Sequence, residues 1–231
     1  MSTEIKQETE TQDEQSPEQI RADVAERLSE KRREQICDAA LELFLQKGFA
    51  STTIRDICAR SGVNQASIYD YISNKNDILR RLLNQLWFRS GAQSLPDLLE
   101  ERPETSLQEN VAYYLKEFWG KRRKGTLLAY RTVPHLTKDD RKVMRTRDEQ
   151  LIRRLAESIE DLTQLSENDP RTLVVANLVL FMASFGPLRD WLHQDLDNDL
   201  VADTVAAAIV AMIENLARYS PEQKVKQPAQ D

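Results

Sequence analysis

The sequence has little of what β-rich, secreted or metal-binding proteins need. Only six glycines and eight prolines interrupt its 231 residues, and strand-like alternation is nearly absent, which excludes a sheet of many short strands. Its two cysteines, Cys37 and Cys58, lie in apolar helical patterns, so we interpret them as reduced core residues without disulfide or metal roles. The two histidines, His135 and His193, have no cysteine or paired carboxylate at metal-ligand spacing.

Motifs that carry enzymatic chemistry are missing as well. The sequence has no glycine-rich phosphate loop, no nucleophile elbow and no zinc motif. We therefore expect no catalytic residue, no metal and no cofactor. No basic and apolar leader opens the chain, and the most apolar run, Leu173 to Leu188, is interrupted by Asn177 and Pro187. We interpret that run as a buried helix rather than a membrane span, and expect a reducing cytoplasm as the location.

The chain also lacks an excess of positive charge. Its 32 Lys and Arg against 38 Asp and Glu give a net charge of -6 and a pI of about 5.2. This balance excludes a bulk-basic nucleic-acid coat, so any contact with DNA has to come from a local patch. Residues 1–15 alone carry five acids and one base. With almost nothing to bury, they are expected to be a disordered acidic tail.

Helix-forming residues fill most of the sequence. Leu, Ala, Glu, Arg and Gln dominate long stretches, and 40% of all residues are hydrophobic, which predicts an all-α fold of one large or two small domains. Ser16 and Gln19 form a capping box for a helix that should reach Lys47, with a weakly amphipathic first half that projects or packs on a partner. The other predicted helices are Lys75 to about Ser94 with Pro96 beyond its end, Leu107 to Trp119 before a break at Gly125, Leu127 to Val133, Thr137 to about Leu165, Asp169 to Gly186 or Trp191, and Leu200 to Tyr219.

The rest of the chain is organised around the stretch from Thr52 to Lys75, which predicts two short helices joined by a tight turn. The apolar residues over 54–58 have the spacing of one buried helical face, and Gly62 stands where a left-handed backbone costs least. Asn64 then offers a cap for a second helix over 65–72, with two isoleucines inward. Such a steep crossing of short helices is the requirement of a DNA-reading helix-turn-helix.

Exposed side chains on the second predicted helix favour DNA reading over an ordinary helical corner, which is the alternative for so common a pattern. Gln65, Ala66, Ser67 and Tyr69 are small or polar, are not needed for a core, and suit base edges and phosphates. The run Lys31-Arg32-Arg33 either contacts a phosphate or the minor groove, or is a solvated helix face. Between Lys31 and Arg80 there are eight basic and six acidic residues, a modest net of +2.

Consecutive motifs then carry a specific family resemblance. The sequence reads FASTTIRDI at 49–57, SGV at 61–63, SIY at 67–69 and NKNDIL at 74–79. Together these motifs resemble the signature of the tetracycline-repressor (TetR) family over roughly residues 32–86. The resemblance implies a homodimeric regulator of about nine helices. In that family a three-helix DNA-binding head is joined by a fourth helix to a ligand-binding body, and the last two helices form the dimer bundle.

The resemblance also implies domain limits and a function. It places a helix-turn-helix DNA-binding domain with an N-terminal helix extension at 16–80, a ligand-binding and dimerisation domain at 81–220, and a tail at 221–231. The implied function is a ligand-responsive transcriptional regulator, not an enzyme. It would be a repressor that binds a palindromic double-stranded DNA operator as a homodimer and is released by a small-molecule effector. The competing classes are an enzyme and a helical adaptor that binds only protein.

Carried over residue by residue, the resemblance assigns eight DNA contacts. The first of them, at the start of the second helix, would hold a phosphate, and the arginine of that helix would approach bases or phosphates. The next three in sequence would face the major groove, and the last three would contact the DNA backbone. The assigned residues are Thr53, Arg55, Gln65, Ala66, Ser67, Tyr69, Tyr71 and Lys75. The chain departs from the family at Asp70, Tyr71 and Ile72, where an aromatic residue, His and Phe are frequent. Asp70 would repel phosphate if it faced DNA, so it is left off the contacts.

The effector is indicated by the basic stretch from Lys121 to Arg147, in which ten basic and two acidic residues give a net charge of +8. This charge favours an anionic effector held at the mouth of an apolar pocket. The chain also resembles TetR members that sense acyl-coenzyme A (acyl-CoA) thioesters, in the arrangement of Tyr130-Arg131, the helix from Arg145 to Leu155 and the segment from Ser184 to Trp191. A solvated basic face, with a neutral aromatic or drug-like effector, is the alternative. The candidate ligand-binding residues are Trp119, Tyr130, Arg131, His135, Arg145, Phe181, Phe185 and Trp191.

Two apolar faces near the C-terminus bear on the oligomeric state. One face is Leu173, Val174, Leu178 and Met182, and the other is Val201, Val205, Ile209 and Met212. They either form a dimer interface or complete one subunit's core. Reading two half-sites needs two heads, which favours the dimer.

Overall fold

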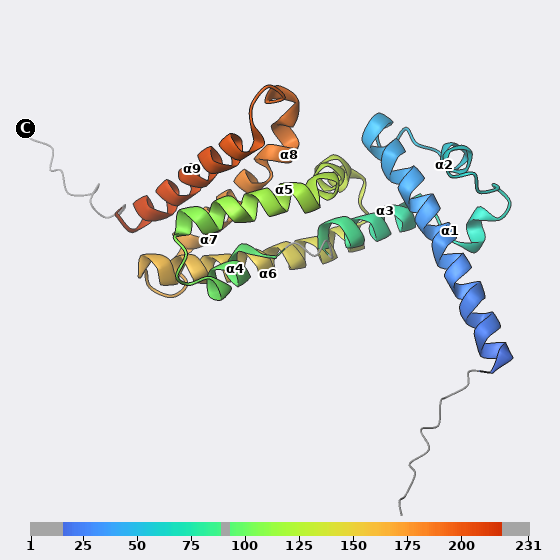
Figure 1. Ribbon diagram of the computed structural model, residues 1–231, viewed down its shortest axis with the longest axis horizontal. Helices are drawn as coiled ribbons and strands as arrows, with labels where there is room; N and C mark the ends of the chain where they lie inside the picture. The colour runs from blue at the N-terminus through green and yellow to red at the C-terminus, as the bar shows by residue number, and fades with distance from the viewer. Residues whose placement is uncertain (1–15, 89–92, 219–231) are drawn as a thin grey trace, which may run out of the picture.

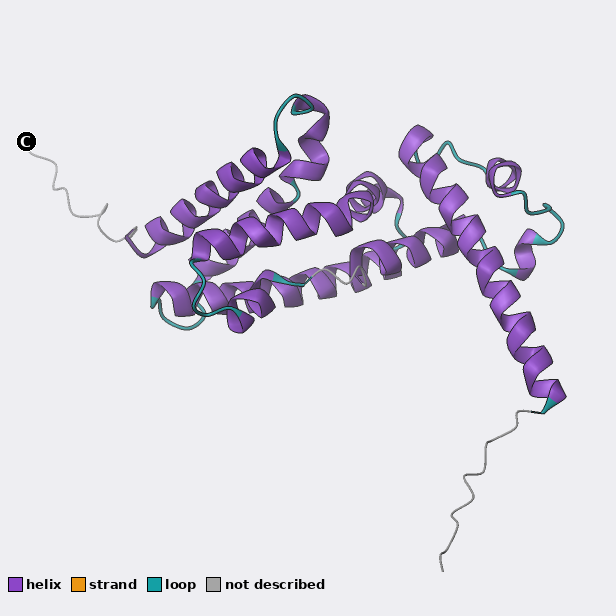
Figure 2. Ribbon diagram, viewed as in Figure 1, coloured by secondary structure: helices purple, strands orange, loops and turns teal. Residues whose placement is uncertain are grey.

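The computed structural model describes residues 16–88 and 93–218, and within these ranges every regular element is helical and none is a strand (Figures 1 and 2). The predicted all-α class is therefore confirmed. The α-helices are α1 (Pro17–Lys47), α2 (Ile54–Ser61), α3 (Lys75–Leu83), α4 (Leu95–Glu101), α5 (Leu107–Thr132), α6 (Lys138–Thr163), α7 (Pro170–Ala183), α8 (Phe185–Arg189) and α9 (Asn198–Arg218). A π-helix, η2 (Asn84–Phe88), continues α3, and short 3-10 helices are η1 (Ile68–Asp70), η3 (Val133–His135) and η4 (Asp190–Leu192).

The predicted first helix runs unbroken from the capping box at Ser16 and Gln19 to Lys47. Its C-terminal half crosses α2 and α3 and buries Ile36, Ala40 and Phe44 against them. Its N-terminal half projects away from the rest of the molecule (Figure 1). We call residues 16–83 the head. The predicted tails at 1–15 and 221–231 lie outside the described residues.

The remainder of the chain forms a bundle that we call the body (residues 95–218). Helices α5, α6, α7 and α9 lie side by side in it, with α5 against α9 and α6 against α7 (Figure 1). Leu115, Ile159 and Ile209 are completely buried in its core. The head has a separate core, closed on the body side by Leu128 and Ala129 of α5. Helix α5 therefore belongs to both cores.

Three predictions about helix ends are wrong. The helix that begins at Lys75 changes to the π-helix η2 at Asn84, and Pro96 lies in the first turn of the new helix α4. Residues 89–92 of the predicted span lie outside the described ranges. Gly125 does not break α5, because its backbone hydrogen bonds continue through the helix. A neighbouring backbone packs into the space that a side chain at this position would occupy. The helix predicted from Asp169 to Gly186 or Trp191 is α7, which ends at Ala183. The chain turns at Ser184 into the separate helix α8.

Gly125 is where the body touches the end of the head's connecting helix. A Cβ atom at this position would lie 2.3 Å from the carbonyl oxygen of Leu86, closer than two such atoms can approach. Glycine therefore allows α5 to pack directly on the backbone of η2. The packing advantage offsets the usual cost of glycine inside a helix, which is about 1 kcal/mol relative to alanine.

No single helix within residues 16–88 and 93–218 has the length and apolar content to cross a membrane, and one pair, α7 with the segment Phe185–Leu192, meets both criteria only together and across a 48° bend.

Candidate nucleic-acid interface and effector cavity

Helix α2 is fixed by the capping residues at its two ends and by Lys47 of α1. The Thr53 hydroxyl accepts a hydrogen bond from the Asp56 amide at 3.1 Å and donates one to Asp56 Oδ2 at 2.7 Å. Lys47 Nζ lies 2.6 Å from the same carboxylate oxygen. Hydrogen bonds from Lys47 and Thr53 lower the Asp56 pKa far below its usual value. At the other end Gly62 adopts the predicted left-handed conformation, with φ of 72°.

The segment that follows, residues 62–74, is less helical than predicted. Only Ile68–Asp70 forms a 3-10 helix, and turns flank it on both sides. The Asp70 amide donates a hydrogen bond to the Ser67 carbonyl oxygen, three residues back, and the Ile72 amide donates one to the Ile68 carbonyl oxygen, four residues back. The α-helix predicted over 65–72 is therefore wrong. One turn of mostly polar and β-branched residues has no long run of bonds to stabilise it, so its conformation follows local caps.

We call residues 62–74 the turn segment. Ile68 and Ile72 are buried in the head core as predicted. The Asn64 side chain accepts from the Ala66 amide at 2.9 Å, and the Ser67 hydroxyl donates to the Asn64 carbonyl oxygen at 3.2 Å. These hydrogen bonds fix the backbone of the turn segment and leave several of its side chains facing solvent. Gln65, Ala66 and Tyr69 are exposed, with Tyr69 58% accessible.

Lys75, one of the predicted DNA contacts, is engaged inside the head. Its ammonium donates to the carbonyl oxygens of Phe49 at 2.7 Å and Thr52 at 2.8 Å, and also lies 3.4 Å from that of Ala50. It stands 4.4 Å from the centre of the Phe49 ring. Burial lowers the Lys75 pKa. In this conformation Lys75 holds the loop that leads into α2, instead of pointing freely to solvent.

The other predicted DNA contacts are distributed over two elements. Thr53 is occupied by the capping box, while Arg55 in the first turn of α2 is exposed. Tyr71 is half-buried, and its carbonyl oxygen accepts from Arg33 Nε of α1 at 3.4 Å. The structure therefore leaves Arg55, Gln65, Ala66 and Tyr69 exposed, and Thr53 is exposed as well although its hydroxyl takes part in the capping box.

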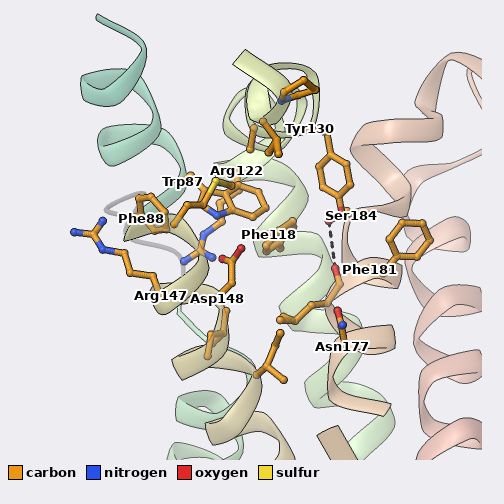
Figure 3. A pocket seen from close by; sticks show the side chains of 17 residues that line it. Trp87, Phe88, Phe118, Arg122, Tyr130, Arg147, Asp148, Asn177, Phe181 and Ser184 are labelled. Atoms are coloured by element: carbon orange, nitrogen blue, oxygen red, sulfur yellow. Dashed lines mark hydrogen bonds between the residues drawn. The ribbon is translucent and has the colours of Figure 1, made fainter. Parts of the chain in front are cut away.

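A cavity of about 790 Å³ lies between η2, α5, α6 and α7. Its walls are mainly aromatic and aliphatic. Figure 3 shows Trp87, Phe88 and Phe118 on one side and Tyr130 and Phe181 on the other. The volume falls within the range of sites for small organic ligands. The cavity borders η2, the direct continuation of α3, so its contents touch the connection between head and body.

Two charged side chains point into this apolar space. Arg122 and Asp148 approach the same region from α5 and α6 (Figure 3). Burial lowers the Arg122 pKa and raises the Asp148 pKa, because each loses water around its charge. A hydrogen bond from the Trp87 side chain opposes the rise at Asp148. The Arg122 guanidinium lies 5.4 Å from the centre of the Phe118 ring.

Only two of the eight predicted ligand residues, Tyr130 and Phe181, line this cavity. Trp119 donates from its indole nitrogen to the Ala183 carbonyl oxygen at 2.8 Å and fills the space above Gly186. Together with Trp191 it lines a second, more polar hollow of about 770 Å³ beside η4. Phe185 packs on the ring of His193, at 5.4 Å between centres.

The remaining three predicted ligand residues point elsewhere. Arg131 donates to the Leu45 carbonyl oxygen at 2.6 Å, across the boundary with the head. The ring of His135 stacks on Phe49 at 5.5 Å. Arg145 is bonded to Glu149 at 2.7 Å on the surface. Helical periodicity could not reveal these directions, because they depend on which face of α5 or α6 meets its neighbour.

The net charge of the basic stretch overstates the positive potential there. Many of its acidic partners stand outside the window of sequence: Lys121 pairs with Glu117, Arg123 with Asp190, and Arg145 with Glu149. In the other direction Asp140 of the stretch pairs with Arg80 of α3 at 2.7 Å. The guanidinium of Arg147 lies 4.3 Å from the centre of the Phe88 ring, at the cavity wall.

Sequence reasoning missed most of the cavity. Its unpredicted lining residues include Trp87, Phe88, Arg122, Arg147, Asp148 and Asn177. One signal was present for Asp148, an acid that directly follows the basic stretch. No signal was present for Trp87 and Phe88, because they line the cavity only through the π-helix, which was not predicted.

Apolar side chains remain uncovered on the outer face of α7 and near the start of α9. The largest exposed fractions on α7 are 60% for both Val174 and Phe181, and Leu178 is 44% exposed. Ile209 of the second predicted face is instead completely buried within the subunit. The first predicted face is thus largely open, whereas the second is partly consumed by the body core.

Comparison with known proteins gives a consistent family. Residues 36–82 match the family described as bacterial regulatory proteins, tetR family. The HTH-type transcriptional regulator HbdR of Aromatoleum sp. (strain CIB) is 32% identical over 139 residues, covering 59% of this chain and 60% of HbdR. The probable acrEF/envCD operon repressor of Escherichia coli (strain K12) is 29% identical over 87 residues, 38% of this chain and 37% of that protein. The chain thus spans about 60% or less of these relatives' length.

Solved structures extend the likeness of fold beyond the head. A regulatory protein of the tetR family from Rhodococcus RHA1 superposes with a TM-score of 0.63 at 15% identity, covering 79% of this chain and 97% of that one. AibR, in complex with isovaleryl coenzyme A and operator DNA, has a TM-score of 0.61 at 20% identity, covering 77% of this chain and 97% of AibR.

Proposed function

Because this chain belongs to the TetR family of bacterial regulatory proteins, we propose that it is a ligand-responsive transcriptional repressor acting in the cytoplasm. It binds a palindromic DNA operator as a homodimer and leaves it when a small molecule binds the body. The observation that carries this proposal is the turn segment, which lies within the family match and presents exposed Gln65, Ala66 and Tyr69 on a hydrogen-bonded frame.

DNA recognition is assigned to the head, residues 16–80 of the predicted domain. The turn segment enters the major groove with Gln65, Ala66 and Ser67 toward base edges. Arg55, Tyr69 and Tyr71 contact phosphates or adjacent bases, and the N-terminal end of α2 at Thr53 lies near a phosphate. Lys75 acts at the backbone only if it leaves its present carbonyl partners; otherwise it supports the frame.

Dimerisation is assigned to the body, which lies within the predicted ligand-binding and dimerisation domain at 81–220. The uncovered apolar side chains Leu173, Val174 and Leu178 on α7 supply a self-complementary face, and α9 lies next to α7 in the same bundle. A two-fold pair of heads reads two half-sites when their centres are about 34–36 Å apart, or a multiple of that distance. Any change in the angle between head and body alters this separation.

The effector site is the cavity that includes Trp87 and Phe88. A ligand there contacts η2, which continues α3 of the head, and α5, which packs on Leu86 through Gly125. A molecule that binds better when the heads are at the wrong separation lowers operator affinity by that difference in binding free energy.

We propose an anionic effector of the acyl-CoA type, with its apolar acyl part against the aromatic walls. Arg122 within the cavity and Arg147 at its wall are the candidate anion contacts. A relative in fold, AibR, was crystallised with isovaleryl coenzyme A. The alternative is a neutral aromatic ligand, which Asp148 and the predominantly apolar walls favour.

Two measurements test the function. The purified protein is expected to retard a duplex containing the palindrome upstream of its own coding region, with steep dependence on salt concentration. Calorimetry then compares short-chain acyl-CoA compounds with neutral aromatic compounds. Binding of only the neutral set refutes the anionic effector, whereas failure to bind any duplex at low ionic strength refutes the regulatory function as a whole.

A further inference from the structure

Among the residues whose side chains are described, the N-terminal part of α1 contributes none to either core. We call residues 16–32 the helix extension. Every residue whose exposure is described in it is exposed, apart from the half-buried Ser29. The head core begins further on, at Ile36. Burial therefore does not explain why sixteen residues continue the helix beyond the domain.

The extension begins beside the turn segment. Arg33, the first residue after it, donates from Nε to the Tyr71 carbonyl oxygen at 3.4 Å and pairs with Glu30 at 3.1 Å. In Figure 1 the α2 and turn-segment side of the head faces away from the body, and the extension runs on beyond it. At 1.5 Å per residue, residues 17–32 reach about 24 Å past this contact.

Charge is separated around the extension. At 100° per residue, Arg21, Lys31 and Arg32 share one side of the helix. The acids Asp23, Glu26, Glu30 and Glu34 gather on the other side, where Arg27 and Arg33 also lie. Within the described ranges Arg21, Lys31 and Arg32 form no ion pair, and Arg32 bonds only to the neutral Gln35 at 3.0 Å. The net charge of the segment is small, but one side of it is positive.

We propose that the helix extension is an additional DNA-binding surface that contacts phosphates flanking the half-site. The inference rests on the proposed function, since a duplex read by the turn segment is brought to the side where the extension projects. A length of about 24 Å corresponds to roughly seven base pairs at 3.4 Å each. Arg21 and the pair Lys31 and Arg32 bind the phosphate backbone near the two ends of this reach, without selecting bases.

A second copy of the chain fits this surface less well. Val24 and Leu28 are apolar residues on the basic side, 50% and 60% exposed. Ile20 extends this row by one turn on the N-terminal side, beside Arg21, and Lys31 and Arg32 end it on the other side. Pairing of two helices needs an apolar seam that repeats every 3.5 residues over several turns, whereas this row has only three apolar members before the charged residues end it. Charge complementarity therefore favours duplex DNA as the partner.

The test compares a duplex that ends at the palindrome with one that carries ten further base pairs on each side. The variant Arg21→Gln/Lys31→Gln/Arg32→Gln is compared with Lys124→Gln/Lys142→Gln/Arg153→Gln, which removes the same charge from exposed body positions. Wild type and control should bind the longer duplex at least tenfold more tightly than the shorter one. The extension variant should lose this advantage, and its log–log salt slope should fall by up to about 2.7 per subunit, at about 0.9 per phosphate contact.

The outcomes separate the two proposals. If the extension variant keeps the full advantage of the longer duplex and the wild-type salt slope, the extension is not a DNA contact, while the regulatory function stands. If wild type binds neither duplex, both proposals are refuted. Size-exclusion chromatography of the variant tests the alternative that the extension pairs with a second copy of the chain. If the variant shifts from dimer to monomer but still binds the longer duplex more tightly, the extension serves subunit pairing and the proposed DNA contact is overturned.

Discussion

The head and the body are built from the same kind of element but specify their structure in different ways. In the head, short-range signals fix the chain: Thr53 caps α2, Gly62 ends it, and Asn64 orders the turn that follows. In the body, helices more than 20 residues long are positioned by contacts between distant segments, such as Gly125 with Leu86. A local motif therefore determines the surface proposed to read DNA, whereas the proposed effector cavity is a product of packing.

The largest effect is expected from a substitution in the turn segment, the surface of the head that is proposed to bind DNA. Ala66→Asp adds a negative charge at an exposed position that carries no core contact. We expect operator affinity to fall about 100-fold, because like charges brought together cost several kcal/mol, while the unfolding temperature stays within about 2 °C of wild type. Gel retardation and thermal unfolding measure the two effects. An unchanged affinity would exclude this surface as the DNA contact.

A stability test in the body uses two glycines of the same helix. Gly125→Ala places a Cβ atom 2.3 Å from the Leu86 carbonyl oxygen and should destabilise the fold by about 3 kcal/mol. Gly120→Ala is the matched control, since a Cβ atom there meets nothing within 4 Å, and should stabilise by up to about 1 kcal/mol. Chemical denaturation gives both values. Equal effects at the two positions would mean that α5 does not pack on η2 as described.

Lys75 tests whether the head relies on an internal contact or on a free cation. Lys75→Met removes the donor from the Phe49 and Thr52 carbonyl oxygens. Leaving buried acceptors unpaired should cost about 1–3 kcal/mol of folding stability. The measurement is urea unfolding in the absence of DNA. Wild-type stability combined with weaker DNA binding would instead assign Lys75 to the phosphate backbone.

The smallest effect is expected at Asp148 in the cavity. Burial raises its pKa, so the folded protein binds this proton more tightly than the unfolded chain does. The contribution of Asp148 to folding stability is therefore lost as the pH rises from the pKa of the unfolded chain, about 3.9, through the raised pKa of the folded protein. Asp148→Asn keeps an acceptor for Trp87 and carries no charge.

The variant should accordingly be more stable than wild type at pH 7, by less than the two preceding changes, and the difference should vanish near pH 4. Thermal unfolding across this range measures it. A variant that is less stable than wild type at neutral pH would show that charged partners stabilise the Asp148 carboxylate by more than burial destabilises it.

Several parts of the fold follow from sequence for local reasons. The capping boxes at Ser16 and Thr53 and the left-handed Gly62 are each determined by residues within four positions. The start of α6 at Thr137 agrees with prediction for the same reason, and α9 begins at Asn198, two residues before the predicted Leu200. The π-helix at Asn84 and the break at Ser184 do not, because both depend on what packs against the backbone there.

The candidate sites divide in the same way. Exposed Gln65, Ala66 and Tyr69 were found because the motif fixes their position relative to the turn. Of the ligand residues, Tyr130 and Phe181 line the cavity, but Arg131 and Arg145 do not. A helical period of 3.6 residues gives the faces of an isolated helix and does not say which face meets an empty space.

The sequence by itself determined the all-α class, the limits of the first helix and the capped turn with its outward polar groups, since each depends on a few neighbouring residues. Only the tertiary structure decided where the cavity lies, which arginines reach it and which are neutralised by acids from other helices. The physical reason is distance along the chain: packing and ion pairing join residues tens of positions apart, such as Arg80 with Asp140 and Arg123 with Asp190, and no local pattern records them.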